Sequence, residues 1–146
     1  MSERTVFQAT PRRHIVSLGP GATVYEAACV MTQANCGSVL IVDTASTLLG
    51  ILTERDLMTR VLAKAIDPAK TVVTKVMTPN PRCVAPEMKV ADAVLIMLER
   101  GFRHLPIVAE GGKLLGVFSA RDALPREVNT AVGLAEFNEQ VNDALG

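Results

Sequence analysis

Two short segments of the sequence carry the residue types that could do chemistry. They are Thr53-Glu54-Arg55-Asp56 and Ser119-Ala120-Arg121-Asp122, both of the form Ser/Thr-x-x-Asp. At the start of a helix, such a segment can form a capping box, in which the hydroxyl and the carboxylate satisfy free backbone N–H groups. A helix start also suits a phosphate, and a nearby carboxylate can accept hydrogen bonds from both hydroxyls of a ribose. The residue types alone favour the structural cap, but the two interpretations are compatible.

Both segments belong to an internal repeat with an offset of 66 residues. LLGILTERDL at residues 48–57 returns as LLGVFSARDA at residues 114–123, and the residues around them align without a gap. Arg4-Thr5-Val6 against Lys70-Thr71-Val72 indicates that the repeat extends towards the N-terminus. Because repetition in register signals a duplicated unit, we predict repeats over residues 4–66 and 70–128, and a C-terminal helical tail over residues 129–146.

Each repeat predicts the same order of elements, β-α-β-β-α. Hydrophobic periodicity and turn residues place a strand at residues 14–18 or 82–84, a helix at 23–33 or 89–100, strands at 38–42 and 48–52 or 104–108 and 114–118, and a second helix after Thr53 or Ser119.

Pro106 and the size of each repeat refine this prediction. Pro106 cannot donate a ladder hydrogen bond, so it should face a free edge or begin the paired segment. A unit of about sixty residues buries little surface alone. The predicted fold class is therefore α/β (α+β), with the two repeats packed as one pseudo-twofold symmetric globule.

Composition argues against several classes of function. Fifteen basic residues balance fifteen acidic ones, and the chain has four Phe, one Tyr and no Trp. Nucleic-acid binding normally needs a basic surface or stacking aromatics, so we expect none. No apolar run is long enough to cross a bilayer, and the first residues lack the order of a secretion signal. We expect a cytoplasmic protein with no membrane contact, with Cys29, Cys36 and Cys83 reduced and no metal site.

The order, spacing and duplication of these elements resemble a tandem pair of cystathionine β-synthase (CBS) domains. The resemblance rests on GILTERD and GVFSARD at the ends of the third strands, on Val76-Met77-Thr78-Pro79, and on RHLPIV at residues 103–108. It covers roughly residues 4–128. It implies a stand-alone regulatory module, not an enzyme, that binds an adenine-containing ligand in clefts between the halves. AMP is the first expectation, with ADP, ATP, NAD or S-adenosylmethionine as alternatives.

The resemblance also implies which residues line two clefts. The first expected site is the Asp122 cleft, formed by Ala22, Ala27, Cys36, Gly37, Arg103, His104, Ser119, Arg121 and Asp122. The symmetric cleft would use Ser38, Thr53, Arg55, Asp56, Lys89 and Phe102.

The clefts should be unequal. Arg103 and His104 stand where the first repeat has Gly37 and Ser38, and a guanidinium is a strong phosphate ligand. The bulk of Lys89 disfavours adenine in the symmetric cleft. The alternative for Arg103 is a solvated side chain at the start of a strand. The alternative for the whole protein is a ligand-free structural or protein-interaction module. Catalysis by Ser119, His104 and Asp122 ranks third, because no nucleophile elbow is present. We also expect a homodimer, in which the tail packs on the core or on a second subunit.

Overall fold

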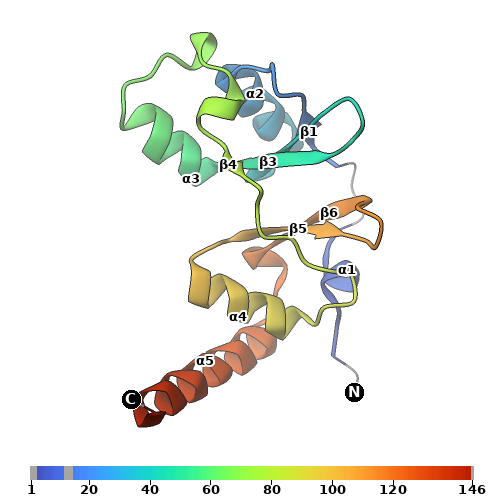
Figure 1. The fold of residues 1–146 in the computed structure, drawn as a ribbon, viewed down its shortest axis with the longest axis vertical. Helices are drawn as coiled ribbons and strands as arrows, with labels where there is room; N and C mark the ends of the chain where they lie inside the picture. Colours follow the sequence, from blue (N-terminus) through green and yellow to red (C-terminus); the bar gives the residue numbers. More distant parts are fainter. Residues whose placement is uncertain (1–2, 12–14, 146) are drawn as a thin grey trace. The chain divides into compact units, whose positions relative to one another are not determined.

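The structure is a computed structural model that describes residues 3–11 and 15–145 (Figure 1). These residues divide into two compact units. One unit lies within residues 15–81, and the other combines residues 3–11 with residues 82–145. The N-terminal segment therefore packs with the second repeat, although it precedes the first. His14, which begins the first predicted strand, lies outside the described residues.

The unit of residues 15–81 is a four-stranded sheet with helix α2. Its elements are β1 (Ser17–Leu18), α2 (Val24–Ala34), β2 (Ser38–Val42), β3 (Leu48–Thr53), α3 (Glu54–Asp56) with a π-helical continuation (Leu57–Leu62), short 3₁₀ turns (Pro68–Lys70 and Val73–Lys75), and β4 (Thr78–Pro79). The strand order is β1-β2-β3-β4, with β1 parallel to β2 and the other pairs antiparallel. Val24, Ala27 and Met31 of α2 are buried in an aliphatic core, which confirms the apolar face read from their helical spacing.

The other unit contains a two-stranded hairpin with three helices. Its elements are α1 (Val6–Ala9), α4 (Val90–Arg100), β5 (His104–Val108), β6 (Leu114–Ser119), a single 3₁₀ turn (Ala120–Asp122) and α5 (Pro125–Leu145). Gly111 and Gly112 both adopt positive φ in the hairpin turn, a conformation that favours glycine. Helix α5 packs along α4 (Figure 1), and the core includes Phe118, Leu105 and Ile107.

The predicted strands and helices are confirmed in their order, which gives the expected mixed α and β fold. The two strands that open the repeats are shorter than predicted, and near Val84 only an isolated bridge to Ile107 remains. Pro106 explains that difference. In the first repeat, the amide of Leu40 donates to the carbonyl of Val16 at 3.0 Å. Pro106 stands at the matching position and has no N–H to donate, so one ladder bond is lost at that edge.

The predicted second helix after Ser119 is wrong in its form. After Thr53, the chain continues from α3 into the π-helical segment. After Ser119, it makes only the single 3₁₀ turn before Ala123 becomes extended, with φ −81° and ψ 145°, and a new helix begins at Pro125. Proline disfavours helical backbone in the residue before it and cannot donate within a helix, so Pro125 separates the two elements.

The segment that precedes each repeat packs on the opposite repeat. The amide of Val6 donates to the carbonyl of Met88 at 2.8 Å, and the amide of Val73 donates to the carbonyl of Ala22 at 2.8 Å. Both valines are fully buried. The matching contacts pair Val6 with Val73, an offset of 67 residues, so the gapless alignment of Arg4-Thr5-Val6 with Lys70-Thr71-Val72 is wrong by one residue.

Helix α5 runs through the predicted start of the C-terminal tail at residue 129 without a break. Gly133 lies inside the helix. Leu134, Phe137 and Val141, which share the helical spacing noted in the sequence, are 38%, 61% and 38% exposed. Their apolar stripe is therefore largely open to solvent in the part of the chain that the structure describes.

Candidate functional site

In the unit of residues 15–81, the acid-bearing turn is a complete capping box. One carboxylate oxygen of Asp56, Oδ2, accepts hydrogen bonds from the amide and the hydroxyl of Thr53 at 3.0 and 3.1 Å. The hydroxyl of Thr53 in turn accepts from the amide of Asp56 at 3.3 Å. The second oxygen, Oδ1, lies 3.6 Å from Nε of Arg60, one helical turn further on. Asp56 is 8% exposed, so both of its oxygens are occupied within the protein.

In the other unit, Asp122 forms the same cap, but only one of its oxygens has a hydrogen-bond partner within the described residues. Oδ2 of Asp122 accepts from the amide of Ser119 at 2.9 Å, and the hydroxyl of Ser119 accepts from the amide of Asp122. Asp122 is only half-buried. Within residues 3–11 and 15–145, its second oxygen has no hydrogen-bond or ion-pair partner. This carboxylate can therefore accept hydrogen bonds from a ligand.

The two turns differ because the backbone after them differs. In the first, the helical backbone continues beyond Asp56, and this brings Arg60 back over the carboxylate in the manner of an i, i+4 pair. In the second, Pro125 begins a new helix. Arg126 stands at the position that matches Arg60, but no continuous helix connects it to Asp122. Arg126 is exposed.

Each acid-bearing turn lies beside the start of the neighbouring strand. Ser38 pairs with Thr53, and His104 pairs with Ser119. The residue before the strand also takes part. The carbonyl of Gly37 accepts from Glu54 at 3.0 Å, and that of Arg103 accepts from Ala120 at 2.9 Å.

Within each unit, the predicted residues at the strand start and at the acid-bearing turn therefore lie next to each other. Arg103 and Arg121 are exposed and His104 is half-buried, so the Asp122 turn has cationic side chains around it. At the Asp56 turn, Arg55 is exposed.

The remaining predicted residues lie in varied surroundings. Ala27 is fully buried in the core, so its side chain has no surface to offer a ligand. Ala22 accepts the backbone hydrogen bond from the segment that precedes the second repeat. Cys36 donates from Sγ to the carbonyl of Ser38 at 3.2 Å. In the other unit, Nζ of Lys89 forms an exposed ion pair of 2.9 Å with Glu3.

Phe102 completes this set. It is 38% exposed just before β5. The predicted clefts combine residues of both units, and that combination stays a prediction.

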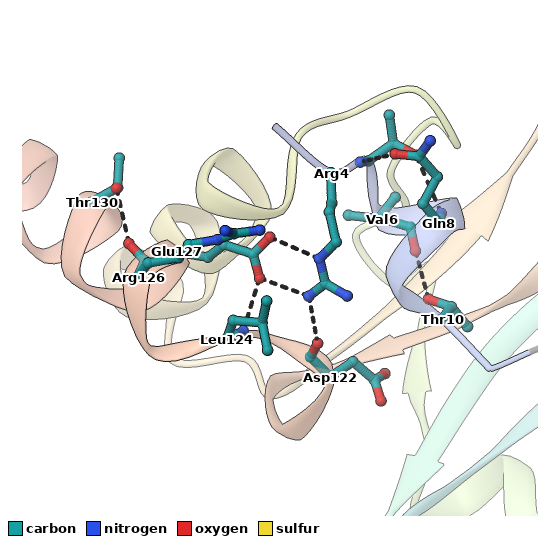
Figure 2. A network of polar contacts seen from close by, with 10 residues as sticks. Arg4, Val6, Gln8, Thr10, Asp122, Leu124, Arg126, Glu127 and Thr130 are labelled. Atoms are coloured by element: carbon teal, nitrogen blue, oxygen red, sulfur yellow. Dashed lines mark hydrogen bonds and ion pairs between the residues drawn. The ribbon is translucent and has the colours of Figure 1, made fainter. Parts of the chain in front are cut away.

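An ion pair that sequence reasoning missed contacts the backbone of the Asp122 turn (Figure 2). Arg4 donates from Nε and Nη2 to the two carboxylate oxygens of Glu127 at 3.0 and 2.7 Å. Nη2 also donates to the backbone carbonyl of Asp122 at 3.1 Å. Oε1 of Glu127 accepts from the amide of Leu124 at 2.8 Å. The signal available in the sequence was Leu-Pro-x-Glu at residues 124–127, a helix start with proline first and an acid two residues later.

The charge state of Glu127 follows from these contacts. The hydrogen bonds from Arg4 lower the pKa of the Glu127 carboxyl from its ordinary value, burial opposes this, and the amide of Leu124 adds to the lowering. Conversely, the hydrogen bond to Glu127 raises the pKa of Arg4. The pair therefore stays ionised at neutral pH.

Neither a metal-ligand cluster nor a membrane-spanning helix occurs in the part of the chain that the structure describes. Residues 3–11 and 15–145 hold no group of three or more His, Cys, Asp or Glu side chains that could bind a metal ion. None of the helices within these ranges is long and apolar enough to cross a bilayer.

Comparison with known proteins gives two matches to one family model. The model described as "CBS domain" matches residues 6–63 and 73–127. An uncharacterized 17.7 kDa protein from Acidianus ambivalens is 40% identical over 114 residues. The match covers 78% of this chain and 66% of that relative, so the chain spans just under two thirds of the relative's length.

Solved structures give the same fold. A protein from Burkholderia ambifaria, described as a putative signal-transduction protein with CBS domains, is 33% identical with a TM-score of 0.74, over 80% of this chain and 86% of that one. CBSX2, solved in complex with AMP, is 27% identical with a TM-score of 0.67, over 90% of this chain and 98% of that one.

Proposed function

Because the chain belongs to the CBS domain family, we propose that it is a regulatory module that binds an adenine-containing ligand at the Asp122 turn and acts on a separate partner protein. The observation that carries the proposal is the second oxygen of Asp122. It is free of partners within the described residues, whereas both oxygens of Asp56 are occupied. AMP is the first candidate, since the similar protein CBSX2 was solved with AMP. ADP, ATP, NAD and S-adenosylmethionine are the alternatives.

The chemistry of the turn fits a nucleoside. Oδ2 of Asp122 is held by the cap, which fixes the direction of the carboxylate, and the free oxygen can accept from a ribose hydroxyl. Arg103 is exposed beside the turn, and its guanidinium suits a phosphate. The other unit has a glycine and a serine at the positions of Arg103 and His104, so its turn lacks the added cation. Arg60 also occupies the second oxygen of its acid, Asp56.

Regulation would follow from linkage. A ligand shifts a conformational equilibrium only by its difference in affinity for the two states. No catalytic step is proposed.

Isothermal titration calorimetry of AMP with Asp122→Asn and Asp56→Asn tests the proposal. Asparagine keeps the size of the side chain and removes its charge. We expect Asp122→Asn to weaken AMP binding by roughly 10- to 100-fold, the loss of one or two charge-assisted hydrogen bonds. The matched variant Asp56→Asn should bind within about threefold of the parent protein. Equal, undiminished binding by Asp122→Asn would refute this assignment of the site.

A second candidate function is a ligand-free protein-interaction module. The observation that favours it is the exposed stripe of Leu134, Phe137 and Val141 on α5, since exposed apolar patches mark association surfaces. In this case, light scattering would show a homodimer that Phe137→Ser dissociates, while none of the five adenine ligands would raise the melting temperature. A binding protein instead gains stability once the ligand exceeds its dissociation constant.

A further inference from the structure

We propose that Arg4 is a positioning residue for Asp122, so that the N-terminal segment completes the ligand-binding turn of the second repeat. This inference rests on the proposed function, because it concerns the affinity of that turn for its ligand. Arg4 lies 118 residues from Asp122 in the sequence, and its guanidinium donates to the carbonyl of Asp122 at 3.1 Å. It acts on the backbone of Asp122 and leaves the carboxylate free.

The capping box and the bond from Ala120 to Arg103 hold the start of the Asp122 turn, and the contact from Arg4 holds the carbonyl at its end. The 3₁₀ hydrogen bond that closes the turn, from the amide of Ala123 to the carbonyl of Ala120, is long at 3.4 Å. After Ala123 the chain is extended. The turn at Asp56, in contrast, continues into helical backbone whose hydrogen bonds hold it. The contact from Arg4 therefore replaces the helical continuation that Pro125 interrupts.

Glu127 fixes the guanidinium in its place. The two hydrogen bonds from Arg4 to Glu127 are bidentate, at 3.0 and 2.7 Å, a geometry that restricts the planar guanidinium more than a single contact does. Glu127 is 8% exposed. Figure 2 shows the guanidinium lying between the Glu127 carboxylate and the Asp122 carbonyl, with Leu124 also bonded to Glu127.

This arrangement belongs to one unit only. The segment that precedes each repeat and packs on the opposite repeat is here called the exchanged segment. By its 67-residue offset, Thr71 in the unit of residues 15–81 stands at the position of Arg4. By the 66-residue offset of the repeats, Val61 stands at the position of Glu127. The arginine of this unit, Arg60, instead approaches the Asp56 carboxylate and donates to the carbonyls of Val76 and Met77 at 3.1 and 3.2 Å. In each unit an arginine connects the exchanged segment to the helical region at or after the acid. Arg60 also pairs with the carboxylate of Asp56, whereas Arg4 contacts only the backbone carbonyl of Asp122.

Calorimetry of AMP binding on the full chain, with a double-mutant cycle, tests the inference. Arg4→Met keeps the length of the side chain and removes its donors, and we expect it to weaken AMP binding by roughly 3- to 30-fold. In the Asp122→Asn background, the same change should have little further effect, because Arg4 acts through Asp122. The exposed control Arg126→Met should bind AMP as the parent does. An equal Arg4→Met effect with and without the Asp122 carboxylate would overturn the inference.

Amide hydrogen exchange gives a readout that does not need AMP. Arg4→Met should increase exchange at the amides of Ser119 and Ala123 and leave Thr53, in the other unit, unchanged. Arg4→Lys, which retains a charge but cannot form the bidentate pair, should restore only part of the protection. If the parent bound none of the adenine ligands, the proposed function would fail, and faster exchange at Ser119 and Ala123 would still support the positioning role. Unchanged exchange at both amides would overturn it.

Discussion

The Arg4–Glu127 pair predicts a pH-dependent loss of stability in Arg4→Met. The substitution removes two charged hydrogen bonds to Glu127 and one to the Asp122 carbonyl. It also leaves the Glu127 carboxylate, whose side chain is 9% exposed, without its cation. Unpairing a buried charge costs about 3–5 kcal/mol. Because the Arg4 side chain is 29% exposed, water compensates part of this, and we expect a loss of about 2–4 kcal/mol at pH 7.

The pH dependence follows from the sign of the shift at Glu127. In the parent protein, the pKa of Glu127 lies below its ordinary value of 4.5, so folding favours its ionised form. The resulting stability is complete above pH 4.5 and is lost as the pH falls through the lower pKa of the folded state. Arg4→Met removes the largest cause of that lowering, so the pKa of Glu127 should be higher in the variant than in the parent, and protonation on acidification removes the unpaired charge. The difference between the two proteins should therefore shrink as the pH falls below 4.5.

Urea unfolding at pH 7, 5 and 4 measures this difference. At pH 7 we expect the midpoint of Arg4→Met to fall by roughly 1–2 M, given an ordinary dependence on urea. Arg126→Met, next to Glu127 but exposed, is the matched control and should unfold close to the parent. Glu127→Gln should be destabilised with little change across this pH range, because the titrating group is absent. A gap between Arg4→Met and the parent that stays constant from pH 7 to pH 4 would refute the reasoning.

Close contacts at Gly50 and Arg60 give two more predictions. An alanine Cβ at Gly50 would lie 2.5 Å from Sδ of Met77 and 2.8 Å from a β4 backbone oxygen. Gly50→Ala should therefore lower the free energy of unfolding by about 1–3 kcal/mol. At Gly133, inside a helix, a Cβ would have nothing within 4 Å, and Gly133→Ala should raise the free energy of unfolding by about 0.5–1 kcal/mol. Urea unfolding separates the two signs, and stabilisation by Gly50→Ala would contradict the packing argument. Arg60→Met should free Oδ1 of Asp56 and raise the calorimetric AMP stoichiometry above that of the parent; an unchanged stoichiometry would count against the ion pair as the reason that the Asp56 turn is the weaker site.

Local patterns were enough to predict most of the secondary structure. The apolar runs Ser38–Val42 and His104–Val108 became β2 and β5 with the same bounds, because continuous apolar strands have no competing helical period. Thr53 and Ser119 form the predicted capping boxes. Such features depend on residues within one turn or one strand, and sequence spacing specifies them directly.

The exchange of N-terminal segments could not be read from the repeat. The apolar character shared by Val6 and Val73 indicates that both are buried, but each bonds to the repeat that it does not precede in the alignment. A duplicated sequence is the same whether each segment packs on its own copy or on the other. Only the long-range contacts, such as Val6 to Met88, distinguish the two arrangements.

The difference between the two acids also depends on a residue to which sequence reasoning gives no role. The sequence identities around Asp56 and Asp122 make the turns look equivalent, and the presence of Arg103 and His104 is the difference that the alignment of the strand starts predicts. Pro125 has the larger consequence, because it ends the helical turn and removes Arg126 from the carboxylate.

The interruption at Pro125 and the exchange of segments then act together. Ending the helix after Asp122 leaves one carboxylate oxygen without a hydrogen-bond or ion-pair partner within the described residues, and the 3₁₀ hydrogen bond that closes the turn is long at 3.4 Å. A segment from the other end of the chain provides Arg4, and Glu127 of the new helix orients it. A duplicated fold can thus give one copy a rigid, occupied acid and the other an available one, because the helix break and its compensating ion pair occur in the same copy.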